Sequence, residues 1–180
     1  FYFQKGIHGI VALDFASLYP SIIRTICLCP SNYTEKEEVV ELWKKKGWKY
    51  TKIETSLMGK HYKGYFLMRI LNENSMGIFP DILDKLFNER KAIKKLMGEA
   101  LDLHVKYKDE GNMEKAKEYK LLHEKYNIQQ LTKKIFMNTF YGVSGNFRSP
   151  LYLLLLAAGT TEYGKKSTKT AFKFVTWILK

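Results

Sequence analysis

Hydrophobic and polar positions alternate differently in the two halves of this 180-residue chain. In the first half, a mainly apolar run over residues 7–15 predicts a buried strand that ends near Asp14. A helix is predicted next, with Ser17 as its N-cap, Pro20 close to its first turn and an end before Pro30.

Two further patterns complete the first half. Residues 34–46 carry acidic residues followed by lysines, which predicts a helix that Gly47 ends. Residues 48–55 and 60–70 are rich in aromatic and β-branched residues and predict a β-hairpin that turns at Met58-Gly59.

The second half has helical periodicity. After a break at residues 77–80, long helices are predicted over residues 81–107 and 113–141, joined by a tight turn into an antiparallel hairpin. Gly142, Gly145 and Pro150 are expected to close this segment, and a last helix is predicted over 160–179. Its expected apolar face consists of Ala171, Phe174, Val175 and Ile178. The fold class that these elements predict is α+β.

The net charge of the chain indicates what kind of partner it binds. The chain has 30 Lys and Arg, of which only four are Arg, against 18 Asp and Glu, so its formal net charge is +12. Such a charge indicates a polyanion, most simply nucleic acid or nucleotides, although lysines that only confer solubility would give the same count. The longest apolar run, Leu151 to Ala158, is too short to span a membrane, so no membrane partner is expected. Cys27 and Cys29 are expected to be reduced thiols in a core, which favours an intracellular protein.

One candidate site lies at the end of the first predicted strand. Asp14 supplies a carboxylate, a ligand type that Mg²⁺ prefers, and the N–H groups of the helix start near Ser17 attract phosphate. The alternative is a surface carboxylate beside an ordinary helix cap.

A second candidate site lies on the helical hairpin. Arg90 and Lys94 share one face, while Lys134, Asn138 and Tyr141 share a face of the second helix, so the cations could surround one anion. Asn138 and Tyr141 could meet a flat base. The alternative is a solvated basic surface.

Four segments resemble the family B DNA polymerases. Residues 14–21, DFASLYPS, resemble motif A, and residues 134–142, KIFMNTFYG, resemble motif B, written K-x-x-x-N-S-x-Y-G, with Thr139 in place of Ser. Residues 77–80 and 88–91 resemble the entry into the fingers, and residues 161–164 resemble the return to the palm. The resemblance implies a palm over 1–80, a fingers hairpin over 81–145 and a return to an antiparallel palm sheet over 146–180.

The family's functional residues can be transferred to the matching positions. Asp14 and the carbonyl of Phe15 would bind two Mg²⁺ ions, for which Mn²⁺ could substitute. Asp14 and Lys134 would be catalytic, Lys134 as a general acid to the pyrophosphate, and Tyr19 would exclude a 2′-OH. The residues assigned to the incoming dNTP are Ser17, Leu18, Tyr19, Arg90, Lys94, Lys134 and Asn138. The residues assigned to the base-pair pocket are Asn138, Tyr141 and Gly142.

One family feature is absent from the sequence. Motif C, an Asp-Thr-Asp hairpin, has no match among the five aspartates, which are Asp14, Asp81, Asp84, Asp102 and Asp109. The resemblance therefore implies a fragment that meets primer–template DNA and needs exonuclease, motif C and thumb segments in the same or a second chain. By itself it is expected to be almost inactive. A basic nucleic-acid-binding module without catalysis, or a degenerate polymerase scaffold, is the alternative.

Overall fold

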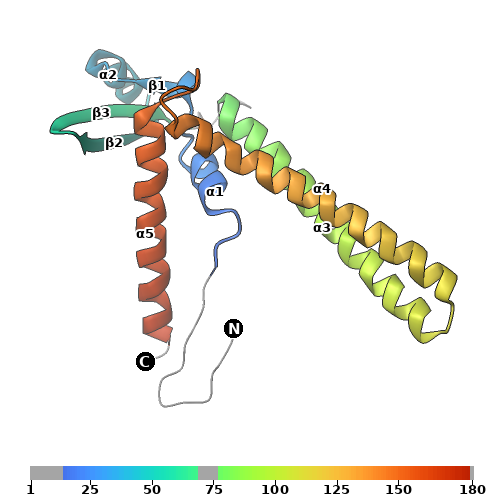
Figure 1. Ribbon diagram of the computed structural model, residues 1–180. Coiled ribbons are helices and arrows are strands. Elements are labelled where there is room, and N and C mark those ends of the chain that lie inside the picture. Colours follow the sequence, from blue (N-terminus) through green and yellow to red (C-terminus); the bar gives the residue numbers. More distant parts are fainter. Residues whose placement is uncertain (1–13, 69–76, 179–180) are drawn as a thin grey trace.

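The computed structural model describes residues 14–68 and 77–178 and has an α+β architecture (Figure 1). A small sheet lies at one end, and three long helices extend from it. The strand predicted over residues 7–15 lies outside the described residues, apart from Asp14 and Phe15, which belong to no regular element. In chain order, the elements are α1 Leu18–Thr25, η1 Pro30–Asn32, β1 Tyr33–Thr34, α2 Glu37–Lys45, β2 Tyr50–Leu57, β3 Lys60–Leu67, α3 Ile78–Asp109, α4 Met113–Gly145 and α5 Leu154–Ile178.

The predicted β-hairpin is confirmed. Strands β2 and β3 pair antiparallel, and β1 pairs with the other edge of β3. Met58 and Gly59 both have positive φ, 49° and 76°, which a two-residue turn of type I′ requires. The predicted short helix is α2, and Gly47 follows it with a φ of 69°.

The predicted helical hairpin is also present. The turn between α3 and α4 contains Gly111 with a φ of 77°, and the side chain of Asn112 accepts a hydrogen bond from the N–H of Lys115 at 3.2 Å. Both helices are longer than predicted. The first begins at Ile78, because Pro80 is tolerated in a first turn, and the second continues through Gly142, which was expected to close it.

The main core lies where the base of this hairpin meets α1, α5 and the sheet. Its buried side chains come from every one of these elements: Ile22, Ile23, Ile26, Leu28, Cys29, Ile53, Phe66, Phe79, Leu83, Met137, Leu155 and Leu156. A second, smaller cluster joins α2 to the opposite face of the sheet through Val40, Trp43 and Tyr65. Cys27 and Cys29 are both buried, as expected, and neither forms a disulfide in the described part of the chain.

The last helix differs most from its prediction. It begins at Leu154, and its packed residues are Leu155, Leu156 and Thr160, near its start. Of the apolar face predicted further along, Phe174 is 58% exposed, whereas Ala171 and Val175 are half-buried. No helix in the described part of the chain is long and apolar enough to cross a membrane.

Candidate active site

The start of α1 is the first part of the candidate site. Ser17 occupies the N-cap position, but its backbone is left-handed (φ 56°, ψ 59°) and its side chain makes no capping hydrogen bond. The predicted N-cap position is therefore confirmed, but the hydroxyl does not cap the helix. Ser17 Oγ instead accepts a hydrogen bond from Arg90 Nη1 of α3 at 3.2 Å. The N–H groups of Leu18 and Tyr19 have no hydrogen-bond acceptor among the described residues, as expected at a helix start.

Two tyrosines connect α1 with α4. The rings of Tyr19 and Tyr141 stack with centroids 4.4 Å apart and an interplanar angle of 27°. The hydroxyl of Tyr141 lies 3.3 Å from Oγ1 of Thr161 on α5. Tyr19 remains 37% exposed, so part of its ring faces solvent. Residues that are 122 positions apart in sequence thus form one aromatic surface at the meeting point of three helices.

The cations of the hairpin differ in their contacts. Arg90 is half-buried and bonds to both Ser17 and Gln130, whereas Lys94 and Lys134 are exposed. Within residues 14–68 and 77–178, neither of these lysines forms an ion pair. Lys134 lies one helical turn after Gln130, so it follows the contact of Arg90 along α4. Asn138 is also exposed, one turn further on.

Ion pairs also connect the helices at the base of the hairpin. Arg24 on α1 pairs with Asp84 on α3, its guanidinium lies 4.3 Å from the centroid of the Phe87 ring, and Asn88 donates to Asp84 at 3.1 Å. Between α3 and α4, Lys133 pairs with Glu89. The hydrogen bond from Lys133 lowers the pKa of the Glu89 carboxyl.

The predicted metal ligands lie at the beginning of the described residues. Asp14 is exposed, and the described residues contain no group of three or more His, Cys, Asp or Glu side chains that could hold a metal. The carboxylate of Asp14 and the carbonyl of Phe15 are hard oxygen ligands, and they fit part of the coordination sphere of Mg²⁺, which usually retains waters and phosphate oxygens.

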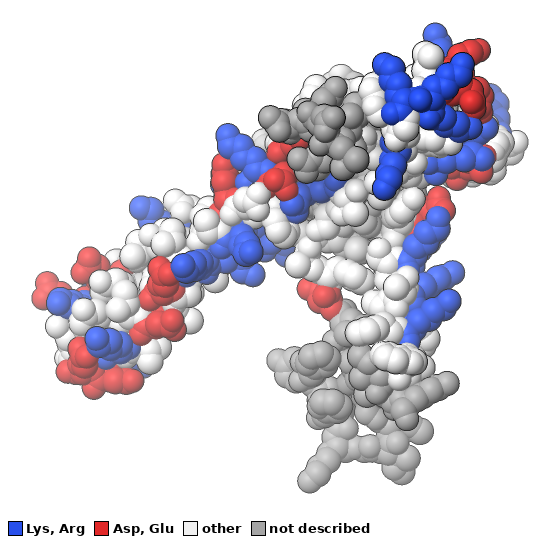
Figure 2. All heavy atoms as spheres, turned by 180° about the vertical axis from the view of Figure 1, so that it is seen from behind, with Lys and Arg blue, Asp and Glu red and all other residues white. Residues whose placement is uncertain are grey.

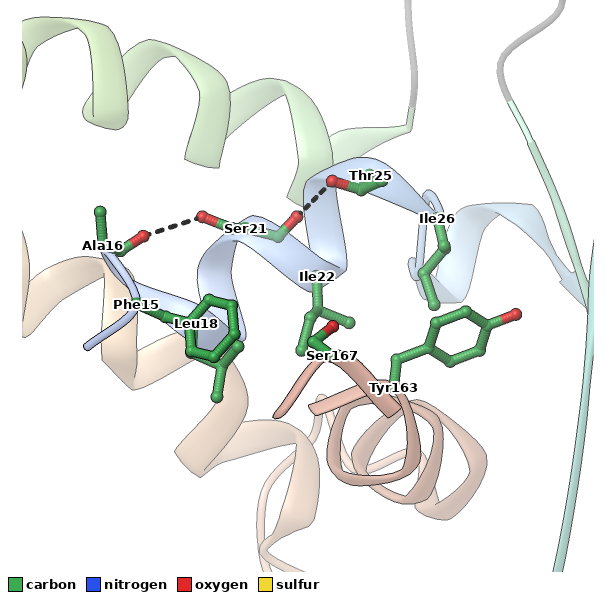
Figure 3. A pocket seen from close by; sticks show the side chains of 9 residues that line it. All are labelled: Phe15, Ala16, Leu18, Ser21, Ile22, Thr25, Ile26, Tyr163 and Ser167. Carbon is green, nitrogen blue, oxygen red and sulfur yellow. Dashed lines mark hydrogen bonds between the residues drawn. The ribbon is translucent and has the colours of Figure 1, made fainter. Parts of the chain in front are cut away.

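Two cavities flank α1. One, of about 220 Å³, is mainly apolar and lies between α1 and α5, with Tyr163 and Ser167 of α5 opposite Ile22 (Figure 3). The other, of about 400 Å³, lies next to Tyr19 and is lined by two lysines of α5, Lys165 and Lys169. Lysines form a column along α5, whereas acidic and basic side chains mix at the far end of the hairpin (Figure 2).

Sequence reasoning missed two of these contacts. It assigned no role to Gln130, which contacts Arg90, although Gln130 precedes Lys134 by one turn on the same helix. Thr161 was noted only as part of a family segment. Gly142 is exposed, and a Cβ added to it would meet nothing within 4 Å.

The comparison with known proteins identifies the family. The model of DNA polymerase family B matches residues 4–178. This chain belongs to DNA polymerase family B. As a family B segment, it is 34% identical over 167 residues to the DNA polymerase beta of African swine fever virus (isolate Warthog/Namibia/Wart80/1980), covering 91% of the chain and 13% of that protein.

Two further relatives come from other organisms. The family B segment is 34% identical over 181 residues to the DNA polymerase of Paramecium bursaria Chlorella virus NY2A, covering 98% of the chain and 17% of the relative. It is 29% identical over 167 residues to the DNA polymerase delta catalytic subunit of Arabidopsis thaliana, covering 92% of the chain and 13% of that subunit. The chain thus spans only a small part of the length of these relatives.

Proposed function

We propose that this chain forms part of the palm and the fingers of a DNA-directed DNA polymerase that adds dNTPs to a primer 3′-OH. Family membership supports the general activity. The stacking of Tyr19 on Tyr141 is the observation that carries the site assignment, because it joins the segment that resembles motif A to the segment that resembles motif B. Residues 1–80 and 146–180 belong to the palm in this proposal, and residues 81–145 are the fingers.

The incoming dNTP binds between α1 and the base of the hairpin. The N–H groups at the start of α1, from Ser17 to Tyr19, hold the β- and γ-phosphates. Arg90, Lys94 and Lys134 approach the same phosphates when the fingers close, which explains why the two exposed lysines have no acidic partner in the described chain. Lys134 also gives a proton to the leaving pyrophosphate.

The sugar and the base meet the aromatic surface. The ring of Tyr19 lies beneath the deoxyribose and leaves no space for a 2′-OH, the group that distinguishes ribonucleotides. Asn138 and Tyr141 border the new base pair. Gly142 has no side chain and therefore lets the base pair approach α4. Tyr141 is oriented for this role by its contacts with Tyr19 and Thr161.

Asp14 and the Phe15 carbonyl would hold Mg²⁺ or Mn²⁺. When bound, these ions activate the primer 3′-oxygen and stabilise charge on the pyrophosphate. The 3′-oxygen loses its proton and forms a bond to the α-phosphorus, while the bond from that phosphorus to the pyrophosphate breaks. The second carboxylate, with the exonuclease and thumb segments, comes from the remainder of the polymerase, and primer–template DNA binds across all of them.

Substitution of Tyr19 tests the proposal. In the complete polymerase that carries this segment, Tyr19→Ala should raise ribonucleotide incorporation relative to deoxyribonucleotides by roughly 10- to 100-fold, since one steric overlap costs about 1–3 kcal/mol. Tyr19→Phe retains the ring and should leave the ratio unchanged. An unchanged ratio in Tyr19→Ala would show that the gate assignment is wrong.

Asp14→Ala separates the proposal from a basic module without catalysis. In the same polymerase, it should abolish primer extension in Mg²⁺ while DNA binding persists, because phosphate contacts of the lysines do not need the carboxylate. Extension at the unaltered rate would contradict a metal-binding role of Asp14.

A further inference from the structure

Gln130 is a buried polar side chain that the proposed reaction does not use. It lies on α4 with 6% of its surface exposed, one turn before Lys134. A buried amide without hydrogen bonds would destabilise the fold, so its partners indicate why it is there. Its Oε1 accepts a hydrogen bond from Arg90 Nε at 3.2 Å.

The orientation of this amide is fixed from its other end. Gln130 Nε2 donates to Oδ1 of Asn127 at 3.0 Å, which leaves the carbonyl oxygen directed to Arg90. On the far side of Arg90, Nη1 donates to Ser17 Oγ at 3.2 Å. Arg90 is therefore held between α4 and the start of α1 by one chain of hydrogen bonds.

These contacts occupy only part of the guanidinium. An arginine has five N–H donors, of which Arg90 uses one on Nε and one on Nη1. Three donors remain, enough for a bidentate contact with a phosphate. Among the described residues no carboxylate pairs with Arg90, and the adjacent Glu89 is engaged with Lys133. The charge of Arg90 is thus held in place but not neutralised.

We propose that Gln130 is a positioning residue for nucleotide binding, which orients Arg90 toward the triphosphate of the incoming dNTP. This inference rests on the proposed function, in which Arg90 binds that triphosphate. A neutral amide suits the role because it directs Nε without competing for the charge, whereas a carboxylate at this position would pair with Arg90.

The test uses single-turnover dNTP incorporation by the complete polymerase on primer–template DNA. Gln130→Leu should raise the apparent Kd for dNTP about tenfold, the effect of losing one hydrogen bond to a charged group, with a smaller change in the maximal rate. Gln130→Glu, which keeps the hydrogen bond but neutralises Arg90, should also raise the apparent Kd. The matched control Gln129→Leu changes an exposed neighbour and should have no effect.

A double variant separates positioning from a general packing defect. If Gln130 acts through Arg90, Gln130→Leu should have no further effect on the apparent Kd in an Arg90→Ala background. Equal effects of Gln130→Leu in both backgrounds, or an apparent Kd unchanged by Gln130→Leu and Gln130→Glu, would overturn the inference while leaving the proposed function intact. An apparent Kd unchanged by Arg90→Ala itself would overturn both.

Discussion

The base and the far end of the α3–α4 hairpin are built from the same two helices but have different surroundings. At the base, Tyr19 of α1 stacks on Tyr141, and Ser17 contacts Arg90. At the far end, α3 and α4 contact only each other in the described chain. There the rings of Tyr107 and Tyr119 stack with centroids 5.4 Å apart.

The difference shows where a helical hairpin acquires a site. Both regions are rich in lysine, but acidic residues alternate with lysines at the far end, whereas Lys94 and Lys134 near the base lack acidic partners in the described chain. Within the described chain, α1 and α5 pack against the hairpin near its base, where the rings of Tyr19 and Tyr141 stack. In the proposed function, the hairpin is therefore the scaffold, and its contact with α1 completes the nucleotide site.

The largest expected effect on stability comes from a cavity at the base. Leu83 of α3 is fully buried in the main core at the base of the hairpin. Leu83→Ala should therefore destabilise the base by about 2–5 kcal/mol. Leu103→Ala, at a half-buried position nearer the far end, should cost about 1 kcal/mol and act locally. Hydrogen exchange of the α1 amides measures the contrast: it should accelerate in the first variant only. Acceleration in both variants would mean that the hairpin behaves as one unit.

A smaller effect is expected from the ion pair between α1 and α3. The Nε atom of Arg24 is buried and has no hydrogen-bond partner among the described residues. Asp84→Asn also removes the negative charge that pairs with Arg24 and should weaken the packing of α1 on α3 by about 1–2 kcal/mol. The value is modest because both side chains are partly exposed. Asp102→Asn, at an exposed position further along α3, is the matched control. Equal protection of the α1 amides in both variants would show that the pair does not hold α1.

The smallest expected effect depends on pH. Because Lys133 lowers the pKa of Glu89 below its ordinary value of 4.5, this pair stabilises the folded hairpin above that pH, and the contribution disappears as the pH falls through the lowered pKa. The stability difference between the unaltered protein and Glu89→Gln should thus be constant above about pH 5.5 and vanish in acid. Glu118→Gln, at an exposed position near the far end, is the matched control. A difference that persists in acid would contradict the sign of this linkage.

Sequence patterns predicted the hairpin well because its cause is local. The turn at Gly111 and Asn112 and the apolar spacing of α3 are visible along the chain. The contact between Ser17 and Arg90 was not visible, because a left-handed backbone at Ser17 and the packing of α1 on α3 decide it. For the end of α5 the sequence predicted an apolar face, but periodicity does not show whether a partner covers such a face, and Phe174 is 58% exposed.

Photolabelling with a dNTP that carries an azido group on its γ-phosphate reports where the nucleotide binds in the complete polymerase with primer–template DNA. If the nucleotide binds at the base of the hairpin, the label is recovered in peptides from the start of α1 or from α3 and α4 around Arg90 and Lys134, and unlabelled dNTP competes. Label that is recovered mainly around Tyr107 and Tyr119, or that dNTP does not displace, would contradict binding at the base.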